Sequence, residues 1–402
     1  MDLGNLIDPV SKGEFFTKYW EKSHLYAPGN GKREFSSVFS LLDLDSALHY
    51  LQSSSTVNIT GGPGPQNRAS SFDTIDNTSW NTIYEKFCKG STIIVNSLHK
   101  TWNPVSRLCA NLCSEIGMEV QANLYVTPRN GKGFECHWDG HDVLVLQLNG
   151  TKNWDLYPQI DELPRPTHPG DKYVKLVNPI KHVTMKPGDV LYVPRGVPHE
   201  AQAGNEASSH LTIGLVATTW EDLMHASVHN LSARNPAMRK SLPFGWSENE
   251  KNVSSSMHEC RAAVDALLTE QTIQDDIDLL AVQLLQSAPC LPDGHFAQFD
   301  LIDHISLDTT VIKRSGNLLR VVKNAQGVTL YHPCGSLAGP DKILWALRFI
   351  ASKELFKVGD IPGWYSNEER LMLVKRLVRA GFLCVHSPSP EVERDDFNEK
   401  AQ

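Results

Sequence analysis

The sequence predicts a mainly β domain, built as a double-stranded antiparallel jelly roll, with helical flanks and a C-terminal winged-helix-like domain. Two observations carry this prediction. Between Val120 and Val216, short β-rich runs alternate with Gly, Pro and Asn and are not separated by helical segments. Before and after this stretch, apolar residues recur at steps of three and four, which is typical of helices.

The expected strands lie close together along the chain. Thr92 to Val95 forms one short β-rich run, and Asn103 to Met118 then reads as an amphipathic helix ending near Gly117. The β-rich runs that follow are Ala122 to Val126, Val143 to Leu148, Asn153 to Tyr157, Val190 to Val193 and Leu211 to Val216. Several strands at such short spacing favour an antiparallel barrel or a double-sheet jelly roll.

We expect three domains. Residues 1–222 form the catalytic domain with its N-terminal helices, residues 223–295 a helical region, and residues 296–402 the winged-helix-like domain with a disordered tail. From Met257 to Leu285 apolar residues follow helical spacing, so this segment needs a partner surface from its own chain or from a second copy. Near the end, Ser366 with Glu369 fits a capping box at a helix start.

Composition limits the function classes. The 402 residues carry a formal net charge of -8, which argues against nucleic acid as the main ligand. No secretory signal is visible at the N-terminus, and no apolar run approaches the roughly 20 residues that cross a bilayer. Eight cysteines occur without a Cys-x-x-Cys pair, so we expect reduced cysteines and a cytoplasmic location rather than a disulfide framework.

The residues that carry chemistry are His137, Asp139 and His199. On a strand, positions i and i+2 share a face, so His137 and Asp139 would point together into the barrel. His199 follows the tight turn from Val193 through Pro194 to Pro198. Two imidazoles and one carboxylate form the facial triad of non-haem Fe(II) oxygenases. The spacing by itself is common by chance; its position within the β-rich segment strengthens the hypothesis.

A cosubstrate with two carboxylates needs a cation at its far end. Lys152 lies at the turn into the strand that follows Val143 to Leu148. A lysine inside an apolar barrel pairs well with an anion and poorly with nothing. A solvated turn lysine is the alternative interpretation.

Together these motifs resemble the JmjC-type ribosomal oxygenases, a branch of the cupin-like 2-oxoglutarate oxygenases. The resemblance is carried by Asn123 to Pro128, by His137-Trp-Asp139, by Val143 to Trp154, by His199 with Ser209 to Thr212, and by Thr219 to Asp222. Its motifs are dense between residues 120 and 222 and sparse elsewhere. It implies a jelly-roll catalytic domain, a helical dimerisation region and a C-terminal winged helix, hence a homodimer.

The resemblance also implies roles for single residues. His137, Asp139 and His199 match the Fe(II) ligands, and Lys152 matches the residue that pairs with the distal carboxylate of 2-oxoglutarate. Asn123, Tyr125 and Thr212 match residues of the same pocket. Two departures bear on this pocket: Gly214 stands where some members carry a serine, and Trp138 stands where a tyrosine is common. His141 and His210 are interpreted as supporting residues rather than a fourth ligand.

The expected function is therefore an Fe(II)- and 2-oxoglutarate-dependent dioxygenase that uses dioxygen to hydroxylate a protein or peptide side chain. The resemblance implies a histidine or arginine of a ribosomal protein as the target. A tailoring hydroxylase of a small peptide or natural product, and an N-methyl-lysine demethylase, remain as alternatives. An inactive cupin or a winged-helix binding protein is the alternative without catalysis.

Overall fold

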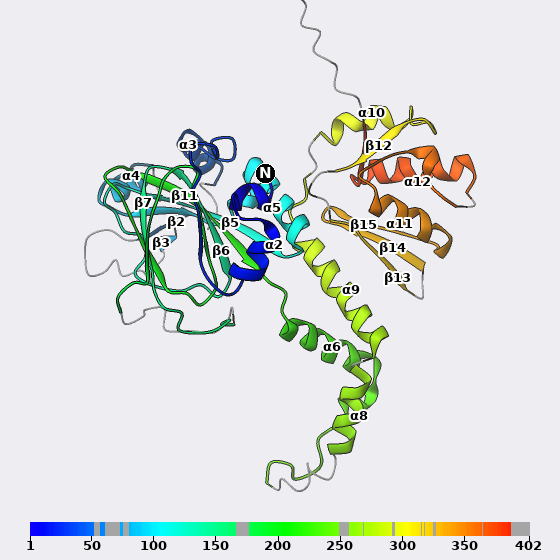
Figure 1. Ribbon diagram of the computed structural model, residues 1–402. Helices are drawn as coiled ribbons and strands as arrows, with labels where there is room; N and C mark the ends of the chain where they lie inside the picture. Colours follow the sequence, from blue (N-terminus) through cyan, green and yellow to red (C-terminus); the bar gives the residue numbers. More distant parts are fainter. Residues whose placement is uncertain are drawn as a thin grey trace, which may run out of the picture. The chain divides into compact units, whose positions relative to one another are not determined.

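The computed structural model describes residues 1–51, 57–60, 73–74, 80–165, 177–248, 257–267, 269–291, 294–314, 316, 318–324, 327–363 and 365–386. The chain forms two compact units, Met1–Leu291 and Pro292–Gln402 (Figure 1). The three-domain division remains a prediction. The predicted tail, residues 391–402, lies outside the described residues.

The first unit contains the predicted jelly roll, made of two antiparallel sheets. The larger sheet has the order β1-β9-β6-β11-β5-β4-β2-β3, and the smaller has the order β10-β7-β8. The strands of the larger sheet are β1 (Leu25–Ala27), β2 (Val57–Thr60), β3 (Asp73–Thr74), β4 (Thr92–Val95), β5 (Glu119–Thr127), β6 (Asp142–Asn149), β9 (Val190–Val193) and β11 (Ser208–Val216). Those of the smaller sheet are β7 (Lys152–Leu156), β8 (Lys181–Met185) and β10 (His199–Ala203).

An apolar core joins the two sheets. Alternate side chains of β6 and β9 pack against inward side chains of the smaller sheet, in the period of two that strands impose. The buried members of this cluster are Val143, Val145, Trp154, Leu156, Val183, Met185, Leu191, Val193 and Val197. The loop from β9 to β10 belongs to this core through Val197, and it ends at His199, the first residue of β10.

Helices lie on the outside of the jelly roll. The N-terminal segment contains α1 (Leu3–Ile7), α2 (Lys12–Glu14) and a π-helix (Phe15–Tyr19), followed by α3 (Leu41–Leu51) and α4 (Trp80–Cys88). A 3-10 turn (Leu98–Lys100) precedes α5 (Asn103–Ile116), as predicted for this region, and α5 packs against β5. Gly117 closes α5 with a left-handed φ of 67°, which a glycine adopts without strain.

The helical region predicted after Trp220 is present. It contains α6 (Trp220–Arg234), a 3-10 turn (Pro236–Arg239), α8 (Met257–Leu267) and α9 (Glu270–Ser287). The helical segment predicted from Met257 to Leu285 forms two helices, α8 and α9. Thr269 divides it by capping α9, where its side chain accepts a hydrogen bond from the Thr272 amide.

The second unit has its own core and two small antiparallel sheets, ordered β16-β12-β17 and β13-β14-β15. Its elements are a 3-10 turn (Phe296–Gln298), α10 (Phe299–Ile302), β12 (Thr310–Lys313), β13 (Arg320–Asn324), β14 (Gly327–His332), β15 (Gly335–Gly339), a 3-10 turn (Asp341–Ile343), α11 (Leu344–Ser352), β16 (Leu355–Lys357), a 3-10 turn (Val358–Asp360), α12 (Asn367–Arg379) and β17 (Leu383–Val385). The Ser366 capping box of α12 is confirmed. The winged-helix assignment remains a prediction.

Two general expectations can be compared with the structure. The expectation that all cysteines are reduced is wrong for Cys290 and Cys334, which are disulfide-bonded. Cys88, Cys109, Cys113, Cys136 and Cys384 are free thiols. Within the described ranges, none of the helices combines the length and the apolar character that a membrane span requires.

Candidate metal centre and cosubstrate cavity

His137, Asp139 and His199 come together at one end of the jelly roll. One ligand atom from each side chain lies within 4.8 Å of the other two. The segment around His137 is irregular, not the regular strand that the sequence predicted. His137 reaches its place through an isolated antiparallel bridge to His199, in which His137 N donates to His199 O at 3.1 Å and His199 N donates to His137 O at 2.7 Å.

Backbone carbonyls orient both imidazoles. His137 Nδ1 lies 2.9 Å from the Glu135 carbonyl oxygen, and His199 Nδ1 lies 3.0 Å from that of Val197. A carbonyl only accepts, so each Nδ1 carries a proton, and in the neutral ring Nε2 is then the nitrogen with the free lone pair. His199 Nε2 lies 3.7 Å from Asp139 Oδ2. The two rings therefore present Nε2 to the space that the Asp139 carboxylate also faces.

The environment of His199 favours its neutral imidazole form. It is buried, and burial first and the neighbouring His137 second lower its pKa to about 4. A neutral imidazole is the form that binds a cation. Two imidazoles and one carboxylate on one side of an ion leave its other positions open, which is the donor set of non-haem Fe(II) oxygenases. The residues present thus fit Fe(II).

A cavity of about 60 Å³ opens beside the triad, between the two sheets. Lys152, the first residue of β7, lines it and is 3% exposed. Its Nζ donates to Thr127 Oγ1 at 3.0 Å and lies 3.4 Å from His210 Nδ1. In the described part of the chain, no carboxylate lies within ion-pair distance of this ammonium group. Burial lowers the Lys152 pKa to about 7.

A buried lysine without an acidic partner is costly, because the interior solvates its charge poorly. A carboxylate entering the cavity would supply the missing counter-charge. The cavity therefore fits an anion whose other end reaches the triad, as 2-oxoglutarate does. The solvated turn lysine considered from the sequence does not agree with this burial.

Of the three other predicted pocket residues, two line the cavity and one does not. Tyr125 and Thr212 line the cavity. Asn123 pairs with Thr212 across β5 and β11, but its side chain accepts a hydrogen bond from the Ser97 amide at 2.8 Å and does not line the cavity. Burial raises the pKa of the Tyr125 hydroxyl, which keeps it protonated.

Three lining groups were not assigned to the pocket from the sequence. Trp154 lines the cavity, and its buried Nε1 has no hydrogen-bond partner within the described residues. His210 stacks on Tyr125 with ring centroids 5.0 Å apart and lies beside Lys152. Thr92, which donates to the Thr127 hydroxyl, also lines it. Only Trp154 had a usable signal, since it is two residues after Lys152 on the same strand face.

Steric contact with His141 explains why a glycine occupies position 214. A Cβ added there would lie 2.8 Å from His141 Cδ2 and 2.9 Å from His141 Nε2. A side chain at this position of β11 would therefore displace the imidazole of His141, which enters the space that a serine would occupy. Gly214 and His141 thus form a complementary pair near the ligand segment.

Comparisons with known proteins agree with this geometry. A family model described as the JmjC domain matches residues 97–223. The bifunctional lysine-specific demethylase and histidyl-hydroxylase NO66 of Drosophila persimilis is 25% identical over 96% of this chain and 63% of its own length. Ribosomal oxygenase 1 of Homo sapiens is 28% identical over 59% of this chain and 38% of its own. The chain thus spans less than two thirds of these curated relatives.

Solved structures share the fold. The Escherichia coli ycfD structure aligns with a TM-score of 0.58 at 16% identity and covers 94% of this chain and 99% of its own. Escherichia coli YcfD, a ribosomal oxygenase, solved with cobalt and 2-oxoglutarate, aligns with a TM-score of 0.55 at 16% identity over 94% of this chain and 99% of its own. At this identity the likeness concerns the fold, and it extends over nearly the whole chain.

Proposed function

We propose that this chain, which contains a JmjC domain and resembles the ribosomal oxygenases, is an Fe(II)- and 2-oxoglutarate-dependent oxygenase that hydroxylates a protein side chain. The single observation that carries the proposal is the convergence of His137, Asp139 and His199 beside the buried ammonium group of Lys152, which has no carboxylate partner among the described residues. A metal site alone would serve many functions. A metal site next to a buried cation fits a cosubstrate that is both a chelator and an anion.

Each group of the chain has a distinct part in this activity. With Fe(II) bound, 2-oxoglutarate and dioxygen supply the oxidising chemistry that converts an unactivated C–H bond to an alcohol, with succinate and carbon dioxide as by-products. The Glu135 and Val197 carbonyls hold the two imidazoles in the tautomer that binds a metal. Lys152 anchors the distal carboxylate, far from the reacting carbon, so it sets cosubstrate orientation. The apolar walls, Val143, Val145 and Trp154, exclude water.

The finer features are also part of the proposal. We take the substrate to be a histidine or arginine of a ribosomal protein, in keeping with relatives named histidyl-hydroxylase and ribosomal oxygenase. We take the enzyme to be a cytoplasmic homodimer. Exposed apolar side chains on the helices α6, α8 and α9, such as Val228, Val264 and Leu279, support the dimer. Light scattering of the purified chain measures the oligomeric state.

Mass spectrometry of ribosomal proteins tests the activity and its substrate. The proteins are incubated with the enzyme, Fe(II) and 2-oxoglutarate, and His137→Ala serves as the control. A gain of one oxygen on a single histidine or arginine, absent with the control, is the expected result. Loss of a methyl group from a lysine would instead favour the demethylase activity that the names of several relatives include. Absence of any product together with absence of metal binding would contradict the proposal.

A further inference from the structure

The two segments that carry the metal ligands are fastened to each other at several points. His137 and His199 exchange two backbone hydrogen bonds. The Gly196 amide donates to the Asp139 carbonyl oxygen at 3.0 Å. A third connection lies between side chains: Arg195 NH1 donates to Asp142 Oδ2 at 3.0 Å. Arg195 lies four residues before His199, and Asp142 lies three residues after Asp139.

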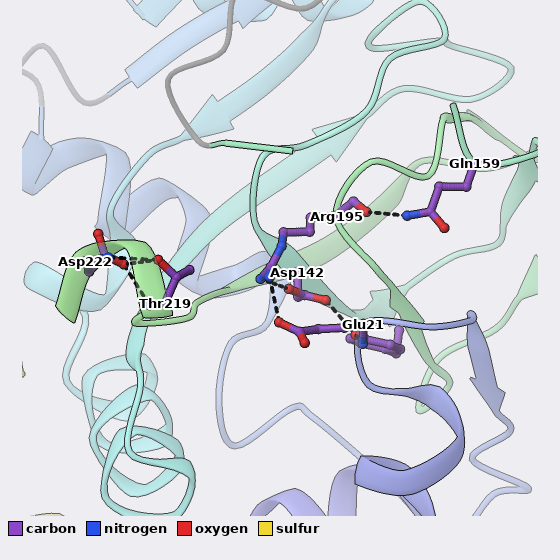
Figure 2. Close-up of polar contacts among 7 residues, drawn as sticks. Glu21, Asp142, Gln159, Arg195, Thr219 and Asp222 are labelled. Atoms are coloured by element: carbon purple, nitrogen blue, oxygen red, sulfur yellow. Dashed lines mark hydrogen bonds and ion pairs between the residues drawn. The ribbon is translucent and has the colours of Figure 1, made fainter. Parts of the chain in front are cut away.

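Arg195 and Asp142 belong to a closed network, drawn in Figure 2. Arg195 NH2 donates to Glu21 Oε1 at 2.6 Å, and the Glu21 amide donates to the Tyr192 hydroxyl at 2.9 Å. The Tyr192 hydroxyl in turn donates to Asp142 Oδ1 at 2.6 Å. The carbonyl oxygen of Arg195 accepts a bond from the Gln159 side chain at 3.4 Å. Hydrogen bonds therefore fix both the guanidinium group and the backbone carbonyl of Arg195.

Because the ion pair between Arg195 and Asp142 is buried, stabilisation of the fold alone explains it poorly. The Asp142 side chain is 0% exposed and that of Arg195 is 8% exposed. Removing two charges from water costs several kcal/mol per ion, and apolar replacements of such pairs are often as stable or more stable. An arginine fork does supply two directed bonds in a fixed plane, which sets geometry more strictly than apolar contacts do.

We propose that Arg195 is a positioning residue for the metal centre: by bridging Asp142 and Glu21 it holds the His199 segment in register with the Asp139 segment. This inference rests on the proposed function, because it concerns the metal that His137, Asp139 and His199 would bind. Arg195 does not touch the ligands themselves. It acts through the backbone between Arg195 and His199 and between Asp139 and Asp142.

The affinity for Mn(II), which binds such sites without oxidising, tests this role in the metal-free protein by calorimetry. Groups hydrogen-bonded directly to metal ligands typically contribute 10- to 100-fold to metal affinity; Arg195 acts one step further out, so Arg195→Met is expected to bind Mn(II) about 10-fold more weakly. Arg33→Met is the matched control. Arg33 is a half-buried arginine that donates to the carbonyl oxygens of Asn5, Asp8, Ala27 and Gly188, none of which belongs to a ligand segment. Its Mn(II) affinity is expected to equal that of the wild type.

A double variant separates positioning from stability. Arg195→Met alone leaves the buried Asp142 carboxylate without its cation, which destabilises the fold. Arg195→Met with Asp142→Leu removes that charge, so its urea midpoint should return toward the wild type while Mn(II) binding stays weak. A stable double variant that binds Mn(II) as tightly as the wild type would overturn the inference. A wild-type protein that binds no Mn(II) would instead overturn the proposed function, and the inference with it.

Discussion

If Lys152 binds the distal carboxylate of 2-oxoglutarate as proposed, its buried ammonium group makes cosubstrate binding depend on pH in a calculable way. Burial lowers its pKa in the ligand-free protein to about 7, from an ordinary value of 10.5. The carboxylate of 2-oxoglutarate binds the protonated form, and its charge raises the Lys152 pKa in the complex. Above pH 7, binding must therefore take up a proton, so affinity falls as the pH rises.

The size of the effect follows from the protonated fraction. Half of the ligand-free molecules carry the proton at pH 7, and about one in a hundred do at pH 9 for a pKa of about 7. The dissociation constant of 2-oxoglutarate should therefore increase about 50-fold between these pH values, equivalent to about 2.3 kcal/mol at 1.36 kcal/mol per pH unit.

Calorimetric titration of the Mn(II)-saturated protein with 2-oxoglutarate at pH 7, 8 and 9 measures this dependence. Lys152→Met should bind weakly at every pH and lose the dependence. Lys152→Arg, whose guanidinium stays charged over this range, should also show a flat profile. An equal pH dependence in the wild type and in Lys152→Met would refute the reasoning, because the titrating group would then lie elsewhere.

Three further outcomes follow from the same structure. Lys152→Met should raise the free energy of unfolding of the ligand-free protein at pH 7 by about 1–2 kcal/mol, as substitutions of strained functional groups often do; a urea melt that shows destabilisation would contradict the cost assigned to the buried charge. Gly214→Ser should lower stability by about 1–3 kcal/mol through overpacking against His141, and combining it with His141→Ala should restore the urea midpoint unless the clash is with another group. Ser366→Ala should cost about 1 kcal/mol by removing the α12 cap and leave succinate formation unchanged; a loss of turnover would indicate that the second unit contributes to the reaction.

The sequence predicted the jelly roll because its central strands carry their own signal. β6 and β9 are runs of apolar residues that are buried along most of their length, so they are readable one by one. β10 was missed because His199–Ala203 has no such run and is only partly buried. Its strand conformation depends on pairing with β7, about fifty residues earlier in the chain, and local propensity contains no information about that pairing.

In the site, too, the residue types could be read from the sequence, whereas the contacts between distant segments could not. The residue types of His137, Asp139, His199 and Lys152 indicated a metal and an anion without knowledge of the fold. The regular strand predicted for His137 was wrong because, among the described residues, His137 pairs through the isolated bridge to His199, sixty-two positions away. The contact of Arg195 with Glu21 spans 174 positions and follows from the packing of the N-terminal segment on the jelly roll.

The placement of the cosubstrate beside the triad is the central claim, and ordered binding tests it most directly. Calorimetry should show that the wild-type chain binds one Mn(II) and then one 2-oxoglutarate, with the second step dependent on the first. His199→Ala should abolish both steps, whereas Lys152→Met should keep the metal and weaken the cosubstrate. Tight 2-oxoglutarate binding that needs neither the metal nor Lys152 would contradict the account.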